Sequence, residues 1–204
     1  MKIYYHDTDI VVCEKEYGIS SQKSDKANMI DILSEHYNTE VYPVHRLDIT
    51  TSGVMVYALN QKSAAALSAD IANHSFEKIY LAIVHGECEP SGEMKDLLYH
   101  DRIKNKSFVV KTKRAGAKEA SLDFERLSYD SSNDLSLVKI ALHTGRTHQI
   151  RVQFASRGHM LLGDGKYGAK DNSKIALHSH IISFIHPQTK KKMSFSSTPA
   201  WIFE

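Results

Sequence analysis

A short segment around Asp48 places a single carboxylate in a run that has the composition of a turn. Arg46 lies two residues before Asp48, and residues 50–53 read Thr-Thr-Ser-Gly. Because a nearby positive charge favours the ionised form of a carboxyl group, we expect Asp48 to be charged. An ionised carboxylate held in a turn is a candidate nucleophile. The alternative is that Asp48 is an ordinary turn residue, which is the commoner role of Asp in such a run.

Two further segments carry residues with chemical potential. Tyr80 lies in the apolar run 79–85, where a strand would point it away from its two neighbours in sequence. Downstream, Arg146 and Arg151 flank a predicted helix start, whose free N–H groups favour anions. Taken singly, these are an ordinary half-buried strand tyrosine and two ordinary surface arginines. A catalytic site requires that both segments converge with Asp48.

The charge of the chain is distributed unevenly. The formal net charge is only +2, but residues 1–100 carry 8 Lys/Arg against 15 Asp/Glu, and residues 101–204 carry 18 against 9. A basic C-terminal half is what a phosphate-binding surface needs, since polyanion affinity rests on cationic contacts. A merely solvated lysine-rich surface is the alternative.

Length and composition indicate an ordinary globular protein. The 204 residues suit one domain or a compact two-lobed unit. No apolar run reaches the ~20 residues that span a bilayer, and the N-terminus lacks the pattern of a secretory signal. Cys13 and Cys88 form no CxxC pair, so we expect a reducing, cytoplasmic setting.

The twelve histidines of the chain raise the question of a metal site. His178 and His180 lie two apart on one predicted strand, and His186 follows nearby. A metal site also needs a third and usually a fourth ligand in reach, and neither cysteine is close in sequence. We therefore expect no bound metal.

The hydrophobic pattern predicts many strands and few helices. Helices are expected at 28–37, at 61–73 with Asn60 as N-cap, and at 147–157 with Gly158 as the stop. The expected strands are a pair within 2–13, then 54–59, 79–85, 107–112, 120–127, 135–142, 175–185 and 191–196. This composition predicts an α+β fold with a mainly antiparallel mixed sheet and flanking helices.

The motifs, read in order, resemble one known family. Residues 45–53 read His-Arg-Leu-Asp-x-x-Thr-Ser-Gly, and residues 76–86 read Phe-x-Lys-x-Tyr-x-Ala-x-x-x-Gly. Residues 144–151 read Thr-Gly-Arg-x-His-Gln-Ile-Arg, followed by Gly-Asp-x-x-Tyr-Gly at 163–168 and by a closing strand within 175–187. Together they resemble the RluA-type RNA pseudouridine synthases. One departure is Gln153, where many members have His.

The resemblance implies a reaction and a set of roles. Pseudouridine formation breaks the N1–C1′ bond of a uridine, turns the uracil and rejoins it through C5, without an external cofactor. Asp48 would be the nucleophile or base, Arg151 its ionic partner, and Tyr80 the residue against the uracil. Arg46 would help to extrude the nucleotide, and Ile150 would offer an apolar face to the flipped ring. The residues expected to contact RNA in the central cleft are Arg46, Thr51, Arg146, His148 and Ile150, with Lys190, Lys191 and Lys192 as further phosphate contacts.

The resemblance also leads to an expected domain organisation, and it leaves two alternative functions to consider. We expect a single catalytic domain over 1–204, without a separate N-terminal RNA-binding domain, acting as a monomer on ribosomal or transfer RNA. The main alternative is a non-catalytic RNA-binding or RNA-chaperone module on the same fold. An unrelated hydrolase with an Asp nucleophile is a further alternative, but it needs an acid/base partner that the sequence does not identify.

Overall fold

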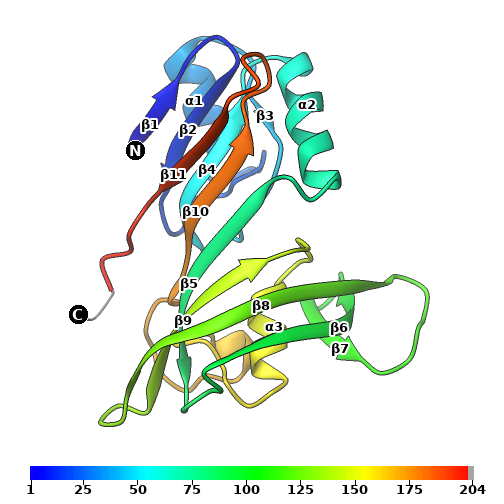
Figure 1. The fold of residues 1–204 in the computed structure, drawn as a ribbon, viewed down its shortest axis with the longest axis vertical. Coiled ribbons are helices and arrows are strands. Elements are labelled where there is room, and N and C mark those ends of the chain that lie inside the picture. The colour runs from blue at the N-terminus through cyan, green and yellow to red at the C-terminus, as the bar shows by residue number, and fades with distance from the viewer. Residues whose placement is uncertain (202–204) are drawn as a thin grey trace. The chain divides into compact units, whose positions relative to one another are not determined.

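The computed structural model describes residues 1–201, which form two compact units. Unit 1 combines residues 1–78 with the C-terminal segment that starts at His178. Unit 2 comprises Ile79–Leu177. Each unit carries its own run of antiparallel strands, and the chain leaves and re-enters unit 1 once (Figure 1).

Unit 1 is built on a mixed sheet in which β4 is central. Its strands occur in the order β1-β2-β4-β10, with β3 paired to β4 and β11 paired to β10. The β4–β10 pair is parallel and the other pairs are antiparallel. The elements are β1 (Ile3–His6), β2 (Ile10–Lys15), α1 (Met29–Tyr37), β3 (Tyr42–Pro43), β4 (Ser52–Ala58), α2 (Gln61–Ala72), β10 (Leu177–Ile185) and β11 (Lys192–Ser196).

The core of unit 1 forms where α2 packs on the sheet. Leu67 of α2 is fully buried against residues of β2, β4 and β10, and Ala64 and Ile71 flank it on the same helix face (Figure 1). The helix begins where expected, because the Asn60 side chain accepts the Ser63 N–H at 2.8 Å. Asn28 caps α1 in the same way through the Asp31 N–H.

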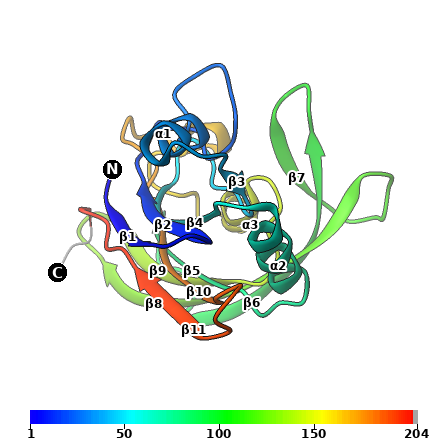
Figure 2. The ribbon, with the colours of Figure 1, turned by 90° about the horizontal axis from the view of Figure 1, so that it is seen from above.

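Unit 2 is an antiparallel sheet with one short α-helix. The strand order is β5-β9-β8-β6-β7. The elements are β5 (Glu77–His85), β6 (Ser91–Asp101), β7 (Lys106–Val110), β8 (Ala117–Asp130), β9 (Leu135–Leu142), α3 (Gln149–Ala155) and the 3₁₀ turn η1 (Gly165–Tyr167). The β6–β7 and β7–β8 loops project from the sheet of unit 2 (Figure 2).

The α+β class is confirmed, and so are the long strands and the helices near 28–37 and 61–73. The prediction for the third helix is too long. His148 adopts a left-handed conformation (φ 55°), so α3 starts only at Gln149 and ends at Ala155. Strand β6 is missing from the prediction. Its charged sequence has weak strand preference, and it forms because β7 and β8 hydrogen-bond to both of its edges.

Candidate active site

The loop that carries Asp48 is fixed by hydrogen bonds on both sides of the carboxylate. On one side, Leu47 is buried, and the Ser21 side chain accepts its N–H (3.1 Å) and donates to its C=O (2.8 Å). On the other side, the Ile49 carbonyl accepts the Gly18 N–H at 2.8 Å. The backbone position of Asp48 is therefore determined by its two neighbours.

A buried lysine lies at the base of this loop. Lys15 ends β2 and is fully buried, and its Nζ donates to the carbonyls of Glu16, Ile19 and Ile49. Burial lowers the pKa of Lys15 to about 8, while the charge of Asp48 acts in the opposite direction. Asp48 thus has a cation of unit 1 in its electrostatic surroundings, which the sequence analysis missed.

Strand β4 leaves the loop through a close contact with β10. Gly53 has φ +118°, and a Cβ at this position would lie 2.6 Å from the Ser179 nitrogen and closer still to its carbonyl oxygen. Beside it, the Ser52 hydroxyl is hydrogen-bonded to His178 Nδ1 at 2.8 Å. The Thr-Ser-Gly that follows the carboxylate therefore serves to bring β4 against β10.

Two further polar atoms in the loop are buried without a protein hydrogen-bond partner among residues 1–201. They are His45 Nδ1 and Thr50 Oγ1. His45 Nε2 accepts the Val56 N–H, so Nδ1 carries the ring proton of the neutral imidazole. Burial lowers the pKa of His45 to about 3, which keeps the ring neutral.

The other sequence-predicted residues of unit 1 occupy different environments. Arg46 is exposed. Thr51 is only 2% exposed, and its N–H donates to the Asp48 carbonyl at 2.9 Å, which closes the turn. Of the two, Arg46 is the one that a large substrate can reach without a change in the loop.

Unit 2 holds Tyr80, Arg146, His148, Ile150 and Arg151. Arg151 is buried in α3 and makes a two-point ion pair with Asp164: Nε lies 2.7 Å from Oδ2 and Nη2 lies 2.8 Å from Oδ1. Asp164 is 0% exposed, and the Tyr167 ring lies 5.2 Å from the guanidinium carbon. Residues 163–168 entered the sequence prediction only as a motif of the resemblance, so Asp164 was not expected as the partner of Arg151.

The remaining residues of the 144–151 motif differ in exposure. Arg146 is exposed, and its Nε donates to the Glu119 carbonyl at 2.9 Å. His148 is 8% exposed, and its Nδ1 is hydrogen-bonded to the Tyr167 hydroxyl at 3.1 Å. Ile150 and Tyr80 are buried. Arg146 is therefore accessible to a phosphate, whereas His148 acts inside the fold.

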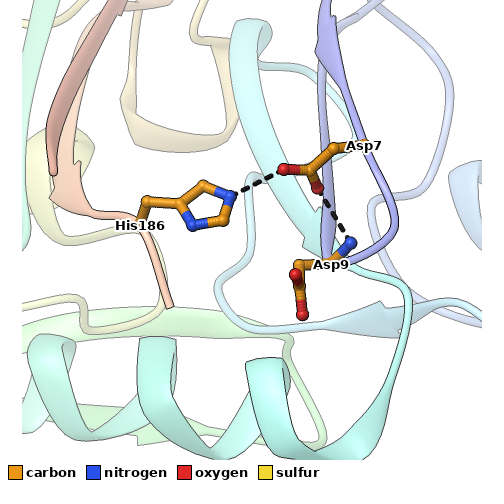
Figure 3. Close-up of side chains that lie close together, drawn as sticks. All are labelled: Asp7, Asp9 and His186. Carbon is orange, nitrogen blue, oxygen red and sulfur yellow. Dashed lines mark hydrogen bonds and ion pairs between the residues drawn. The ribbon is translucent and has the colours of Figure 1, made fainter. Parts of the chain in front are cut away.

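A separate cluster of Asp7, Asp9 and His186 brings three metal-type ligand atoms within 4.8 Å of one another (Figure 3). His186 Nδ1 accepts the N–H groups of Gln188 and Thr189, so the ring proton is on Nε2, which donates to Asp7 Oδ2 at 2.8 Å. Asp7 Oδ1 in turn accepts the N–H groups of Asp9 and Ile10. These bonds fix the β1–β2 turn and engage both ring nitrogens of His186 and both carboxylate oxygens of Asp7.

The two other histidines considered as ligands are also engaged. His178 bonds to the hydroxyls of Ser52 and Ser197, and His180 Nδ1 lies 2.7 Å from the Ser197 carbonyl. Within residues 1–201, no helix is both long and apolar enough to span a membrane.

Comparison with solved structures identifies the fold. The chain superposes on the structure of human RNA pseudouridylate synthase domain containing 1 with a TM-score of 0.83, covering 98% of this chain and 84% of that one. Human RNA pseudouridylate synthase domain containing 4 gives a TM-score of 0.80 over 98% and 89%. Sequence identities of 22% and 21% make these likenesses of fold.

Sequence comparison defines the family. The family model described as RNA pseudouridylate synthase matches residues 9–156. tRNA pseudouridine synthase C of Haemophilus ducreyi is 31% identical over 97% of this chain and 90% of its own length. Ribosomal large subunit pseudouridine synthase C of Buchnera aphidicola is 32% identical over 94% of this chain and 65% of its own length. The chain belongs to the RNA pseudouridylate synthase family, and it is an isomerase that acts on RNA.

Proposed function

We propose that Asp48 starts the isomerisation, as nucleophile or base, on a uridine of ribosomal or transfer RNA. The observation that supports this most is the Asp48 loop. Its backbone is held by Ser21 on one side and by Gly18 and Lys15 on the other, and Lys15 adds a buried positive charge. A backbone fixed in this way limits the positions that the Asp48 carboxylate can take, and an attacking group requires a defined position.

Arg151 and Tyr80 complete the proposed chemistry in the RNA-bound enzyme. Arg151 is the ionic partner of Asp48, and its direction is set beforehand by the two-point pair with Asp164. Tyr80 lies against the uracil and takes the C5 proton after the ring has rejoined through C5. The reaction moves one glycosidic bond within a nucleotide, so it calls for no metal and no organic cofactor.

The proposed RNA contacts divide into direct and indirect ones. Arg46 and Arg146 are exposed cations and act directly, Arg46 on the extruded nucleotide and Arg146 on phosphate. Ile150 is also buried, and we propose that its apolar side chain meets the flipped base only in the RNA-bound enzyme. Thr51 and His148 are buried, so they act by holding the Asp48 turn and the loop before α3.

The names of two relatives support the proposed substrate class. One similar enzyme is named for tRNA and another for the large ribosomal subunit. We propose that this enzyme acts on one of these two RNA classes. We also propose that it works in the cytoplasm as a monomer.

The test is a pseudouridine map of total RNA from cells that lack the gene, complemented with wild type or with Asp48→Ala. We expect one or a few pseudouridines to be absent in the deletion and restored by wild type only, with a turnover loss of at least ~10³-fold for the purified variant. Asp25→Asn, which changes an exposed carboxylate of unit 1, is the matched control and should restore every site.

The same experiment separates the alternatives. A folded Asp48→Ala protein that restores the missing sites would refute the catalytic role. A protein that binds RNA while no site depends on the gene, in cells or with the purified protein on ribosomal and transfer RNA, would favour the non-catalytic RNA-binding module.

A further inference from the structure

A pocket in unit 2 lies apart from the residues assigned to the reaction, except for Arg146. Its volume is about 570 Å³, within the range of about 300–1,000 Å³ that is typical of small-molecule sites. Residues of four segments line it: the end of β6 with its turn, Ser107 of β7, the start of β8 with the glycine before it, and the loop before α3. All four segments belong to unit 2.

The walls of the pocket are positively charged. Arg102, Lys118 and Arg146 line it, and Asp101 is the one carboxylate among the lining residues. Asp101 Oδ1 accepts the N–H groups of Ile103 and Lys104, so this carboxylate serves the β6–β7 turn. The whole segment 102–118 contains seven Lys/Arg and no Asp/Glu. Such a concentration favours a polyanionic ligand.

The pocket also offers a flat aromatic surface. Tyr99 is one of the lining residues, and the Arg114 guanidinium stacks on one face of its ring with the guanidinium carbon 3.6 Å from the centroid. Gly116 lies beside the ring, and a Cβ there would come 3.6 Å from Tyr99 Cε2. Stacked Tyr and Arg planes are a common platform for unpaired bases.

An apolar side chain stands at the rim of the pocket. Ile103 is 98% exposed in the β6–β7 turn, between Arg102 and Lys104, and it is among the residues that line the pocket. No residue within the described range 1–201 shields it. An apolar residue between two cations is the kind of wedge that nucleic-acid-binding proteins place against a base.

Hydrogen bonds connect the segments that line the pocket in the absence of a ligand. Ser107 Oγ donates to the Thr147 carbonyl at 2.6 Å, which connects β7 to the loop before α3. Arg146 Nε donates to the Glu119 carbonyl, which connects the same loop to β8. The pocket is therefore preformed, and a ligand does not have to assemble it.

We propose that this pocket binds an unpaired nucleotide of the substrate RNA other than the uridine that is isomerised. Arg102, Lys118 and Arg146 contact its phosphate, and its base lies on Tyr99 against Ile103. The inference rests on the proposed function for the identity of the RNA as substrate. The pocket would thereby help the enzyme to select RNAs that carry an unpaired nucleotide in addition to the target uridine.

The test compares a fluorescein-labelled RNA stem–loop with a fully paired RNA duplex of the same composition, by anisotropy at constant ionic strength. Tyr99→Ala should weaken binding of the stem–loop about tenfold and leave duplex binding unchanged, since only an unpaired base can stack. Ile103→Ala should act in the same direction to a smaller extent. Because Ile103 is almost fully exposed, this variant keeps its fold and makes the test independent of the fold of Tyr99→Ala.

A second pair of variants tests the charges. Lys118→Ala should weaken binding of both RNAs, because both present phosphates. Lys139→Ala, which removes an exposed lysine on β9 outside the pocket, is the matched control and should leave both affinities unchanged. Unchanged stem–loop affinity in Ile103→Ala and Lys118→Ala would overturn the proposal. So would displacement of the stem–loop by poly-L-aspartate as readily as by unlabelled RNA, which would indicate an acidic protein partner.

Turnover distinguishes this inference from the proposed function. With RNA from cells that lack the gene, the pocket variants should need more RNA to reach half-maximal rate, while the single-turnover rate at saturation stays at the wild-type value. Wild-type affinity in the pocket variants, with Asp48→Ala inactive, would overturn the pocket and leave the function standing. Loss of selective stem–loop binding in the pocket variants, with wild type inactive on every RNA, would support the pocket as an RNA site and overturn the function.

Discussion

At the scale of a residue, Asp164 both balances the buried positive charge of Arg151 and orients its guanidinium. The guanidinium is buried, and a buried charge is costly unless it is paired and hydrogen-bonded. Asp164 meets two of its donors in the parallel geometry that Arg and carboxylate prefer. The ion pair thereby joins α3 to the turn before η1. It also holds the Arg151 guanidinium, which we propose as the ionic partner of Asp48.

Replacing Asp164 with Asn should therefore destabilise the protein strongly. The substitution keeps the size of the side chain but removes the buried carboxylate charge that pairs with Arg151 at two points. We expect the free energy of unfolding to fall by about 3–5 kcal/mol, measured by denaturant titration. Glu125→Gln, which removes the exposed partner of Lys139 in the same unit, should leave the midpoint nearly unchanged. Equal midpoints for Asp164→Asn and Glu125→Gln would contradict the role given to the ion pair.

The sequence identified the groups that carry the proposed chemistry but not the residues that hold them. Asp48, Tyr80 and Arg151 stand out because they belong to motifs that resemble a family. Ser21 is 26 residues from Leu47, and Asp164 is 13 residues from Arg151. Such partners are brought together by the fold, and a motif does not say which residue of another segment it will contact. The direct contact expected between Arg151 and Asp48 stays a prediction.

At the scale of an element, the parallel pairing of β4 and β10 requires a residue without a side chain at position 53. Gly53→Ala would place a methyl group against the backbone of Ser179 and would force φ +118° on a residue with a Cβ. We expect a loss of at least ~3 kcal/mol in the free energy of unfolding, measured by thermal and denaturant unfolding. Gly165→Ala is the control, because its Cβ would meet no atom within 4 Å and its φ is ordinary. A Gly53→Ala protein as stable as that control would show that β4 and β10 do not approach this closely.

The same strand pair contains a titratable group that makes stability depend on pH. His178 is buried between the hydroxyls of Ser52 and Ser197, and burial lowers its pKa from 6.5 to about 4, with a small opposing effect of Glu14. As the pH falls from 6.5 towards 4, the unfolded chain binds a proton at this residue and the folded chain does not. The unfolded state is therefore favoured, and the stability of the folded state falls across this window.

His178→Gln should remove this part of the pH dependence. The difference in unfolding free energy between wild type and variant should shrink by about 3 kcal/mol between pH 7 and pH 4, since one pKa unit corresponds to about 1.4 kcal/mol. Other titrating groups affect both proteins and cancel in the difference. Denaturant titrations at several pH values provide the measurement, and parallel curves would contradict the prediction.

Element prediction succeeded where local signals and tertiary structure agree. Helix α2 has an Asn cap, an apolar face and no competing signal, and it forms from Gln61 as expected. Strand β6 has the opposite balance, because its side chains favour solvent while its neighbours β7 and β8 supply hydrogen bonds on both edges. Its existence depends on pairing partners as far away in sequence as Glu125, which pairs with Ser91, 34 residues earlier, and a local pattern does not contain them.

At the scale of the whole molecule, the positive charge of the C-terminal half is concentrated in one segment, residues 102–118. Unit 2 carries 16 Lys/Arg against 12 Asp/Glu, and seven of these cations lie in residues 102–118. The lysines near the C-terminus differ in their surroundings. Lys190 Nζ donates to the Pro187 carbonyl, and Lys192 forms an ion pair with Glu77. Those interactions compete with phosphate, whereas the segment 102–118 contains no acidic residue.

Two triple variants of equal charge decide which basic surface meets RNA. One replaces Arg102, Lys104 and Lys118 with Ala, and the other replaces Lys190, Lys191 and Lys192. Removing one cation that binds a phosphate should reduce the slope of log affinity against log salt concentration by about 0.7 for single-stranded RNA. We expect the first variant to lower the slope by about 2, because its cations have no acidic neighbour in the segment, and the second to change it little. Titrations of a labelled RNA stem–loop at several salt concentrations supply both slopes. A larger drop in the second variant would place the RNA-binding surface on unit 1 and remove the charge argument for the pocket of unit 2.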